Sequence, residues 1–435
     1  MRRTRIATLA TAVAVAAGVG GFLAVSSPDA QAATTSRIPA HVFAPYFEAY
    51  NGDSLNGLSQ QSGNNFLTIA FAQTASVGSC TALWDGDTPI SSSNYGSDIA
   101  AMRARGGDII PSYGGYAADN QGTELADSCG NVNSIAADFE KMITTYDVTR
   151  IDLDVEDNSL SRTDGIDRRN KAIAQVESWA AANGRLIQFS YTLPTSPNGL
   201  EPNALAILQN AKQNNARVDI VNIMTFDYYD GANHDMAAAT QTAATGLFNQ
   251  IKQVWPGKTD AQYWGMVGII EMNGEDDYAN DSGNLNAETF TLANATTVTN
   301  WAKSKGIGAL SFWALQRDNG GCAGQAPGDR NCSGVSQSTW QFSHLMQGFT
   351  SGSSSTTPPT TQPTTPPTTP PTTKPTTPPT TKPTTPPAGT TWAPNTAYKA
   401  GQVVTYAGKS YKCLQSHTSL VGWEPPNVPA LWQAL

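Results

Sequence analysis

The sequence predicts an α/β protein: a (β/α)8 TIM barrel, then a Pro/Thr-rich linker and a small all-β domain. Eight short runs rich in β-branched and aromatic residues alternate with stretches of helical spacing, which favours a parallel sheet. The segment that contains them, residues 37–348, has a length typical of one such barrel. Repeated Pro-Thr-Thr units fill residues 351–390 and predict an extended spacer before the aromatic-rich segment 391–435.

The N-terminus has the pattern of a secretory signal peptide, so residues 1–32 are expected to be removed. Basic residues open the chain, an uncharged run rich in Ala, Val and Gly follows, and Ala30-Gln31-Ala32 provides a small-x-small cleavage site. A membrane anchor is the alternative, but much of the run is Ala, Gly and Thr rather than strongly apolar. We therefore expect a secreted, extracellular protein that does not associate with a membrane.

Charge and cysteine content restrict the partners. The formal net charge is −9 and basic clusters are few, whereas nucleic-acid binding depends on Lys and Arg at phosphates, so a neutral polymer is the better candidate. Five cysteines suit an oxidising compartment, and their spacing favours the disulfides Cys80–Cys129 and Cys322–Cys332, although spacing alone does not fix the pairing. The four histidines are scattered, so we expect no metal site and no cofactor.

The eight β-rich runs are the expected barrel strands. They cover residues 42–47, 66–71, 107–113, 150–155, 186–193, 218–226, 263–270 and 308–313. Stretches of helical spacing separate most of these runs; in residues 168–182, for example, Ala172, Ile173, Val176 and Trp179 fall on one face. An open doubly wound sheet is the alternative, but no Gly-rich phosphate loop follows the first run. We therefore predict a closed barrel.

The fourth run alternates strictly between apolar and acidic residues. On a strand, Asp152, Asp154 and Glu156 share one face, and in a barrel that face points inward and rises toward the C-terminal rim, where barrel active sites lie. Carboxylates roughly 6–7 Å apart in a partly dry space retain a proton, which is the state that a general acid needs. Glu156 is nearest the rim and is the predicted donor. A calcium loop is excluded, because the EF-hand spacing would need Gly at Asp157 and Glu at Thr163.

Four motifs, in order along the chain, resemble glycoside hydrolase family 18. The strand-four signature D-x-x-D-x-D-x-E corresponds to residues 149–156, with Thr149 in place of the first Asp. The strand-three motif S-x-G-G begins at Ser112, the strand-six motif M-x-Y-D begins at Met224, and the strand-eight tryptophan is Trp313. The chain is most similar to bacterial and archaeal chitinases with an atypical signature.

The resemblance implies a chitinase that hydrolyses β-1,4 links between N-acetylglucosamine units with retention of configuration. Glu156 would protonate the glycosidic oxygen while the carbonyl oxygen of the sugar's own 2-acetamido group attacks the anomeric carbon and forms an oxazolinium ion. Asp154 would hold the acetamide N–H, and Asp152 would share a proton with Asp154. Water would then open the intermediate with Glu156 as base.

Residues at the strand ends are expected to bind the sugar. They are Trp313, Asp227, Met224, Tyr228, Tyr46 and Tyr191. Trp313 would form an apolar floor under the sugar at the cleavage point, and Asp227 would bind the same sugar or support the carboxylates. Phe226 departs from the family, in which a tyrosine hydroxyl binds the acetamide oxygen, so Tyr228 or Tyr229 is expected to supply that hydroxyl.

The C-terminal segment 391–435 is similar to carbohydrate-binding modules of families 5 and 12. Its three tryptophans and three tyrosines exceed what so small a core can hide, so some should be exposed. We expect Trp423, Trp432 and Tyr406 to bind chitin, and Trp392 and Tyr411 to be interior. The expected partners of this monomeric chain are thus chitin and chitooligosaccharides.

Two other functions fit the same strand signature. One is an endo-β-N-acetylglucosaminidase that cuts N-glycans, and the other is a non-catalytic chitin-binding barrel lectin. Lectins of this fold typically lack the acid, whereas Glu156 is present. The linker and the C-terminal module favour an insoluble polymer as substrate.

Overall fold

The computed structural model describes residues 35–277, 288–324, 331–351, 390–394, 396–419, 424–426, 428 and 431–435. The chain divides into two compact units, Met1–Thr357 and Pro358–Leu435. The expected signal peptide, and the expected linker apart from its end residues, lie outside the described residues. None of the helices in the described ranges combines the length and apolar character that a bilayer crossing requires.

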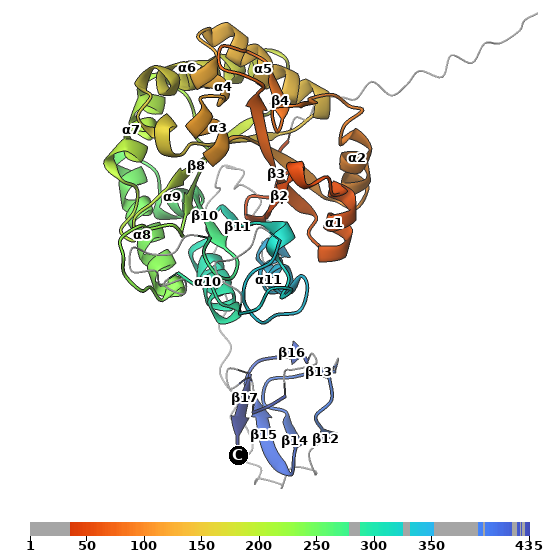
Figure 1. Ribbon diagram of the computed structural model, residues 1–435. Helices are drawn as coiled ribbons and strands as arrows, with labels where there is room; N and C mark the ends of the chain where they lie inside the picture. Colours follow the sequence, from red (N-terminus) through yellow and green to blue (C-terminus); the bar gives the residue numbers. More distant parts are fainter. Residues whose placement is uncertain are drawn as a thin grey trace, which may run out of the picture. The chain divides into compact units, whose positions relative to one another are not determined.

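The first unit is a closed parallel barrel, as predicted (Figure 1). Its strands are β1 (Val42–Phe43), β2 (Tyr46–Glu48), β3 (Phe66–Thr74), β6 (Asp108–Gly114), β7 (Arg150–Asp154), β8 (Gln188–Pro194), β9 (Ile220–Met224), β10 (Val267–Met272) and β11 (Ala309–Trp313). Strands β3 and β6 to β11 pair in parallel with their sequence neighbours, β1 pairs with β11, and β2 pairs with β3. Because β1 and β2 are halves of one strand position, the sheet closes on itself.

Two strands begin or break where the sequence pattern did not indicate. The first run is interrupted at Pro45, which has no N–H to donate to a ladder. The seventh starts at Val267 rather than at 263, because Tyr263 belongs to α9 (Asp260–Trp264). A capping box formed by Thr259 and Gln262 starts that helix, which local aromatic content does not reveal.

Helices surround the barrel (Figure 1). They are α1 (Leu55–Ser62), α2 (Gly96–Ala104), α3 (Tyr116–Gln121), α4 (Leu125–Ser128), α5 (Val132–Tyr146), α6 (Thr163–Ala182), α7 (Pro202–Gln213), α8 (Met236–Val254), α9, α10 (Leu292–Lys305), α11 (Gln341–Met346) and α12 (Gly348–Ser351), with 3-10 turns η1 (Ala49–Asn51), η2 (Asp157–Leu160) and η3 (Leu315–Arg317). The predicted inner face of α6 is confirmed, since Ala172, Ile173 and Val176 are fully buried.

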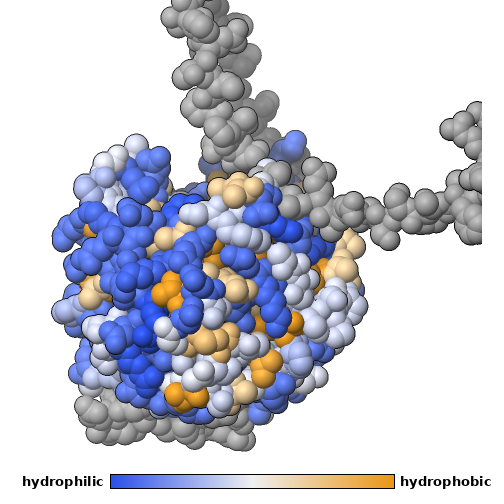
Figure 2. All heavy atoms as spheres, turned by 90° about the horizontal axis from the view of Figure 1, so that it is seen from above, coloured by the Kyte–Doolittle hydropathy of each residue, from blue (hydrophilic) through white to orange (hydrophobic). Residues whose placement is uncertain are grey.

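Alternation along the strands separates two apolar layers. Outward residues of β7, such as Ile151 and Leu153, join the large cluster under the helices. A smaller cluster inside the barrel includes Tyr46, Met224 and Phe226. On the face that Figure 2 shows, groups of apolar residues lie among polar ones.

Both predicted disulfides are present. Cys80–Cys129 ties the segment after β3 to the end of α4, beside the hairpin of β4 (Ala82–Trp84) and β5 (Thr88–Pro89). Cys322–Cys332 closes the segment that follows η3.

The described part of the second unit is all β. Strands β12 (Thr390–Thr391), β14 (Val403–Tyr406), β15 (Lys409–Cys413) and β17 (Trp432–Ala434) form one sheet, and β13 (Ala397–Tyr398) pairs with β16 (His417–Thr418). Its small core includes Trp392, Tyr398 and Tyr411, which confirms the interior placement of Trp392 and Tyr411.

The prediction that Trp432 is exposed is wrong. Its side chain is 2% exposed and packs edge-on against Tyr398, with ring centroids 5.1 Å apart. A domain this short needs its largest apolar side chains to build a core. Tyr406 is half-buried against Trp392, and Trp423 lies outside the described residues.

Candidate active site

A cleft of about 1170 Å³ opens at the carboxyl ends of the barrel strands. Aromatic and acidic side chains dominate its lining. The sequence-predicted residues that line it are Tyr46, Asp154, Glu156, Met224, Asp227, Tyr228 and Trp313. The structure therefore brings together side chains that lie far apart in the sequence, at the end of the barrel where the carboxylate strand was expected to point.

Asp152 is the deepest of the three carboxylates and is surrounded by donors. Ser112 (2.8 Å), Ser190 (2.5 Å), Thr192 (3.1 Å) and the hydroxyl of Tyr46 (3.0 Å) all donate to its oxygens. The amide of Asn222 adds a fifth hydrogen bond, of 3.2 Å. Burial raises the pKa of Asp152, and the hydroxyl donors oppose this rise. Because a carboxylate accepts all these bonds without a proton of its own, the surroundings suit the ionised form.

Asp154 has the opposite surroundings. It is 4% exposed, and its Oδ1 has no hydrogen-bond partner among the described residues. Burial raises the pKa of Asp154 well above its ordinary value, and the charges of Glu156, Asp152 and Asp119 raise it further. Of the two aspartates, Asp154 is therefore the one whose surroundings favour the protonated form.

Glu156 follows β7 and lines the cleft. Burial, with the charges of Asp157 and Asp277, raises the pKa of Glu156 to about 7, while the backbone N–H of Tyr116 donates to its carboxylate and opposes this rise. A carboxyl group that is about half protonated at neutral pH can give a proton and then take one back.

The start of α3 holds Glu156 in place. Tyr116 N–H donates to the Glu156 side chain, and the Glu156 backbone N–H donates to Asp119 Oδ2 at 2.5 Å. This contact requires two glycines before α3: a Cβ on Gly114 would lie 2.0 Å from Asp154 O, and one on Gly115 would lie 2.5 Å from Phe71. Both glycines also have φ near 90°, which side chains rarely adopt. The S-x-G-G motif is thus explained by close packing beside the carboxylates.

Aromatic rings form one wall of the cleft. Trp313 stacks on Phe71, with centroids 5.5 Å apart and ring planes 13° apart, and also contacts Tyr46. Met224 and Phe226 belong to the same apolar cluster. These rings give the cleft an apolar face of the kind that sugar rings stack against.

Asp227 lies across the cleft, in the segment after β9. Burial, with the charges of Asp276 and Asp277, raises the pKa of Asp227 to about 10. Its backbone N–H donates to Asp276 Oδ2 at 3.0 Å. At neutral pH the side chain is therefore a neutral hydrogen-bond donor and acceptor at the edge of the site.

The two tyrosines after Asp227 differ in direction. Tyr228 is 7% exposed, and the largest charges acting on its hydroxyl are those of Glu271 and Glu288. Glu271 accepts a hydrogen bond from Thr240 of α8, so the Tyr228 hydroxyl lies toward the helix layer although its ring lines the cleft. Tyr229 is 58% exposed, lines the cleft and is influenced by Asp227 and Asp157. Tyr229 is therefore better placed than Tyr228 to offer a hydroxyl to a ligand.

The prediction that Tyr191 belongs to the cleft is wrong. It is fully buried in the outer apolar layer, and its hydroxyl donates to Asn170 of α6 at 2.7 Å. Pairing of β7 with β8 places Ser190 beside Asp152 and Thr192 beside Asp154, so the residue between them faces outward.

Sequence reasoning missed several residues of the site. Phe71 is the last residue of the second β-rich run and Tyr116 directly follows the glycine pair, so both carried a local signal. Asp119 and Asp277 reach the site only through the tertiary fold. No local pattern indicates them.

Two groups in the described residues bring potential metal-ligand atoms within 4.8 Å of one another. They are Asp230, His234 and Glu288, and Asp227, Asp276 and Asp277. In the first group the His234 ring already bonds Asp230 at 3.0 Å.

Comparisons with known proteins agree with this geometry. The model of glycosyl hydrolases family 18 matches residues 42–271, and the model of carbohydrate-binding module family 5/12 matches residues 391–433. A probable bifunctional chitinase/lysozyme of Escherichia coli (strain K12) is 30% identical over 325 residues, which cover 72% of this chain and 35% of that protein. Endochitinase 11 of Metarhizium anisopliae is 30% identical over 293 residues, covering 64% of this chain and 53% of that protein. The chain thus spans about a third and about half the length of these two relatives.

A solved chitinase structure is also similar to this chain. Active domain 2 of the thermostable chitinase of Pyrococcus furiosus, as catalytic-site mutants complexed with chito-oligosaccharides, is 28% identical, with a TM-score of 0.63. The similarity covers 73% of this chain and 97% of that chain. Because the family model matches residues 42–271, more than half of the chain and with the carboxylate strand among them, this chain belongs to glycosyl hydrolase family 18 and carries a carbohydrate-binding module of family 5/12 at its C-terminal end.

Proposed function

We propose that this protein is a secreted chitinase that hydrolyses β-1,4 links between N-acetylglucosamine units with retention of configuration. The observation that carries the proposal is the inward row of Asp152, Asp154 and Glu156, in which the deepest group suits the ionised form and the outermost has a pKa of about 7. The row thus provides a proton donor at the cleft and a negative charge beneath it.

In the proposed reaction, Glu156 donates its proton to the glycosidic oxygen as the C–O bond breaks. The carbonyl oxygen of the sugar's 2-acetamido group forms a bond to the anomeric carbon, which gives an oxazolinium ion. Asp154 accepts the acetamide N–H and, with Asp152, balances the positive charge. Water then adds at the anomeric carbon, Glu156 takes its proton, and the product has the original configuration.

The cleft supports this reaction with an apolar face and polar contacts. Trp313, stacked on Phe71, would lie under the sugar at the cleavage point. Tyr229 would donate its hydroxyl to the acetamide oxygen in place of the family tyrosine that Phe226 replaces. Asp227, protonated at neutral pH, would hydrogen-bond the same sugar.

The C-terminal module would hold the enzyme on insoluble chitin. Tyr406 is the half-buried aromatic that supports this role in the described residues, and Trp423 remains a candidate from the sequence. We expect export after removal of residues 1–32 and a monomeric mature protein. N-terminal sequencing of protein from the culture medium and its mass in solution test these two points.

Three substrates distinguish chitinase from its alternatives. Purified protein is incubated with colloidal chitin, a chitin hexasaccharide and an N-glycan with a chitobiose core, with Glu156→Gln as the control. We expect soluble oligosaccharides from chitin, and NMR of the fresh hexasaccharide products should show the β-anomer first. Cleavage of the N-glycan alone would instead identify an endo-β-N-acetylglucosaminidase, and binding without cleavage would identify a lectin.

A further inference from the structure

Arg150 lies on the same inward face of β7 as the three carboxyl groups. The strand alternates, so residues 150, 152, 154 and 156 point to one side. Arg150 is 2% exposed, and its guanidinium donates to Gln188 Oε1 through Nε (3.3 Å) and Nη2 (3.0 Å). In the described residues these contacts are with a neutral amide. A cation therefore lies beneath the catalytic row without a direct carboxylate contact.

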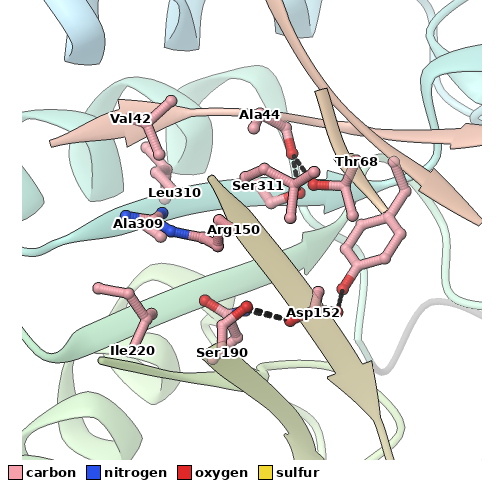
Figure 3. A pocket seen from close by; sticks show the side chains of 13 residues that line it. Val42, Ala44, Thr68, Arg150, Asp152, Ser190, Ile220, Ala309, Leu310 and Ser311 are labelled. Atoms are coloured by element: carbon pink, nitrogen blue, oxygen red, sulfur yellow. Dashed lines mark hydrogen bonds between the residues drawn. The ribbon is translucent and has the colours of Figure 1, made fainter. Parts of the chain in front are cut away.

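A small cavity joins Arg150 to Asp152. It has a volume of about 20 Å³, enough for one water molecule, and both side chains line it (Figure 3). Its polar lining also includes Ser190, Asn222 and Ser311. In Figure 3 the Ser190 hydroxyl reaches Asp152 beside the cavity. Arg150 and Asp152 thus line the same small cavity, whose other walls are both apolar and polar.

The charges around this space favour attraction between the two groups. Burial lowers the pKa of Arg150 to about 10, against the raising effect of Asp219 and Asp152, so the side chain is charged at neutral pH. The titratable groups that face Asp152 are Tyr46 and Asp154. An ionised carboxylate in a barrel interior is costly unless it is paired and hydrogen-bonded. The five donors satisfy the bonding, and Arg150, whose positive charge interacts with Asp219 first and with Asp152 second, is a nearby opposite charge.

We propose that Arg150 is a positioning residue whose buried positive charge keeps Asp152 ionised and thereby leaves the proton of the aspartate pair on Asp154. The idea rests on the proposed function for its kinetic consequence. Arg150, at the start of β7, would thus influence catalysis without donating a proton to the substrate and without contacting the sugar.

Loss of the Arg150 charge should shift the acidic limb of the pH profile of kcat/KM more than the alkaline limb. Without Arg150, the carboxyl groups protonate at higher pH, so the acidic limb of kcat/KM moves up. Arg150 is two residues from Asp152, about 6–7 Å along a strand, but six residues from Glu156, about 20 Å. Coulomb energy falls with distance, so we expect a shift of about one pH unit on the acidic limb and about a third of that on the alkaline limb.

The test compares Arg150→Met, which removes the charge at similar volume, with Arg150→Lys, which retains it. Arg150→Met should show the uneven shift, and Arg150→Lys should restore most of the parent profile. In an Asp152→Asn background, Arg150→Met should no longer produce the larger shift of the acidic limb. Arg103→Met is the control for the loss of an arginine charge near the start of a barrel strand. It breaks the ion pair of Arg103 with Asp108 at the start of β6. A lower rate with an unchanged profile, or the same shift in Arg103→Met, would overturn the proposal.

Thermal unfolding gives a readout that does not need activity. Arg150→Met should bind more protons when folded, so its Tm should fall relative to the parent as pH rises from about 4 to 7. If the Tm of Arg150→Met and that of the parent change with pH in parallel, the proposed role of Arg150 is wrong even when the parent is active. If the parent is inactive, the proposed function is wrong, but the Tm comparison still tests Arg150. Arg150→Gln is made beside Arg150→Met. If neither variant folds, the charge serves the barrel rather than the site, and the proposal fails.

Discussion

Asp157 provides a test of how the protein sets the pKa of its acid. Its charge is the largest charge that raises the pKa of Glu156, which is about 7. Asp157→Asn removes that charge and should lower the pKa of Glu156. Asn also tolerates the left-handed backbone at this position, where φ is 38°, so the fold should be retained.

The magnitude follows from Coulomb's law and exposure. A negative charge about 7 Å away raises the pKa of a carboxyl group by more than one unit at an effective dielectric constant of about 20. Asp157 is exposed, and solvent screening reduces this to roughly half a unit. Since Glu156 must carry a proton to act as acid, activity falls as pH rises through its pKa. The alkaline limb of Asp157→Asn should therefore lie about half a unit lower than that of the parent.

The assay is the pH dependence of kcat/KM on a soluble chitin oligosaccharide, from pH 4 to 9. Asp164→Asn is the matched control, because Asp164 is an exposed acid at the start of α6 and does not line the cleft. Its profile should overlay that of the parent. An alkaline limb of Asp157→Asn that stays in place or moves upward would refute the electrostatic reasoning.

Three further predictions concern other parts of the chain. Tyr229→Phe should lower kcat about 10-fold or more, the effect of losing a hydrogen bond to developing charge, and Tyr228→Phe should lower it much less; the reverse order in steady-state kinetics would identify Tyr228 as the donor instead. Trp432→Ala should abolish both the unfolding transition of the C-terminal module and chitin adsorption, because this side chain is buried in the core of the module. If calorimetry shows an intact transition while adsorption is lost, Trp432 contacts chitin instead. Replacing Cys80 and Cys129 by Ser should lower the free energy of unfolding by about 4 kcal/mol in the chain-entropy model, because the bond spans 49 residues; an unchanged denaturation midpoint would contradict that estimate.

The barrel and the carboxylate row were predictable because their signals are local. A period of two residues along β7 separates Ile151 and Leu153 from Asp152 and Asp154. The structure confirms the separation, because Ile151 and Leu153 join the outer apolar cluster whereas Asp154 lines the cleft. The same rule applied to β8 would have excluded Tyr191 from the cleft, since Ser190 and Thr192 are the polar residues of that strand. That error came from choosing an aromatic residue by type and not by its position in the alternation.

Other features depend on contacts that a single sequence does not reveal. Asp119 accepts the Glu156 N–H only because the glycine pair turns β6 directly into α3. The peptide bonds Ala70–Phe71 and Trp313–Ala314 are cis, which nothing in a sequence without proline at those positions indicates. Trp432 could be placed inside only once the pairing of β15 with β17 was known. These are consequences of tertiary structure, where local propensity gives no guide.

The most direct measurement of the central claim is the rate of chitin hexasaccharide hydrolysis by Glu156→Gln. The substitution keeps the size of the side chain and removes the transferable proton, and general acid–base catalysis contributes about 10²–10⁴ in rate. We predict a loss of kcat of at least about 100-fold, with binding of the oligosaccharide retained and the Tm within a few degrees of the parent. A folded Glu156→Gln protein that hydrolyses the substrate at close to the parent rate would contradict the assignment of the acid.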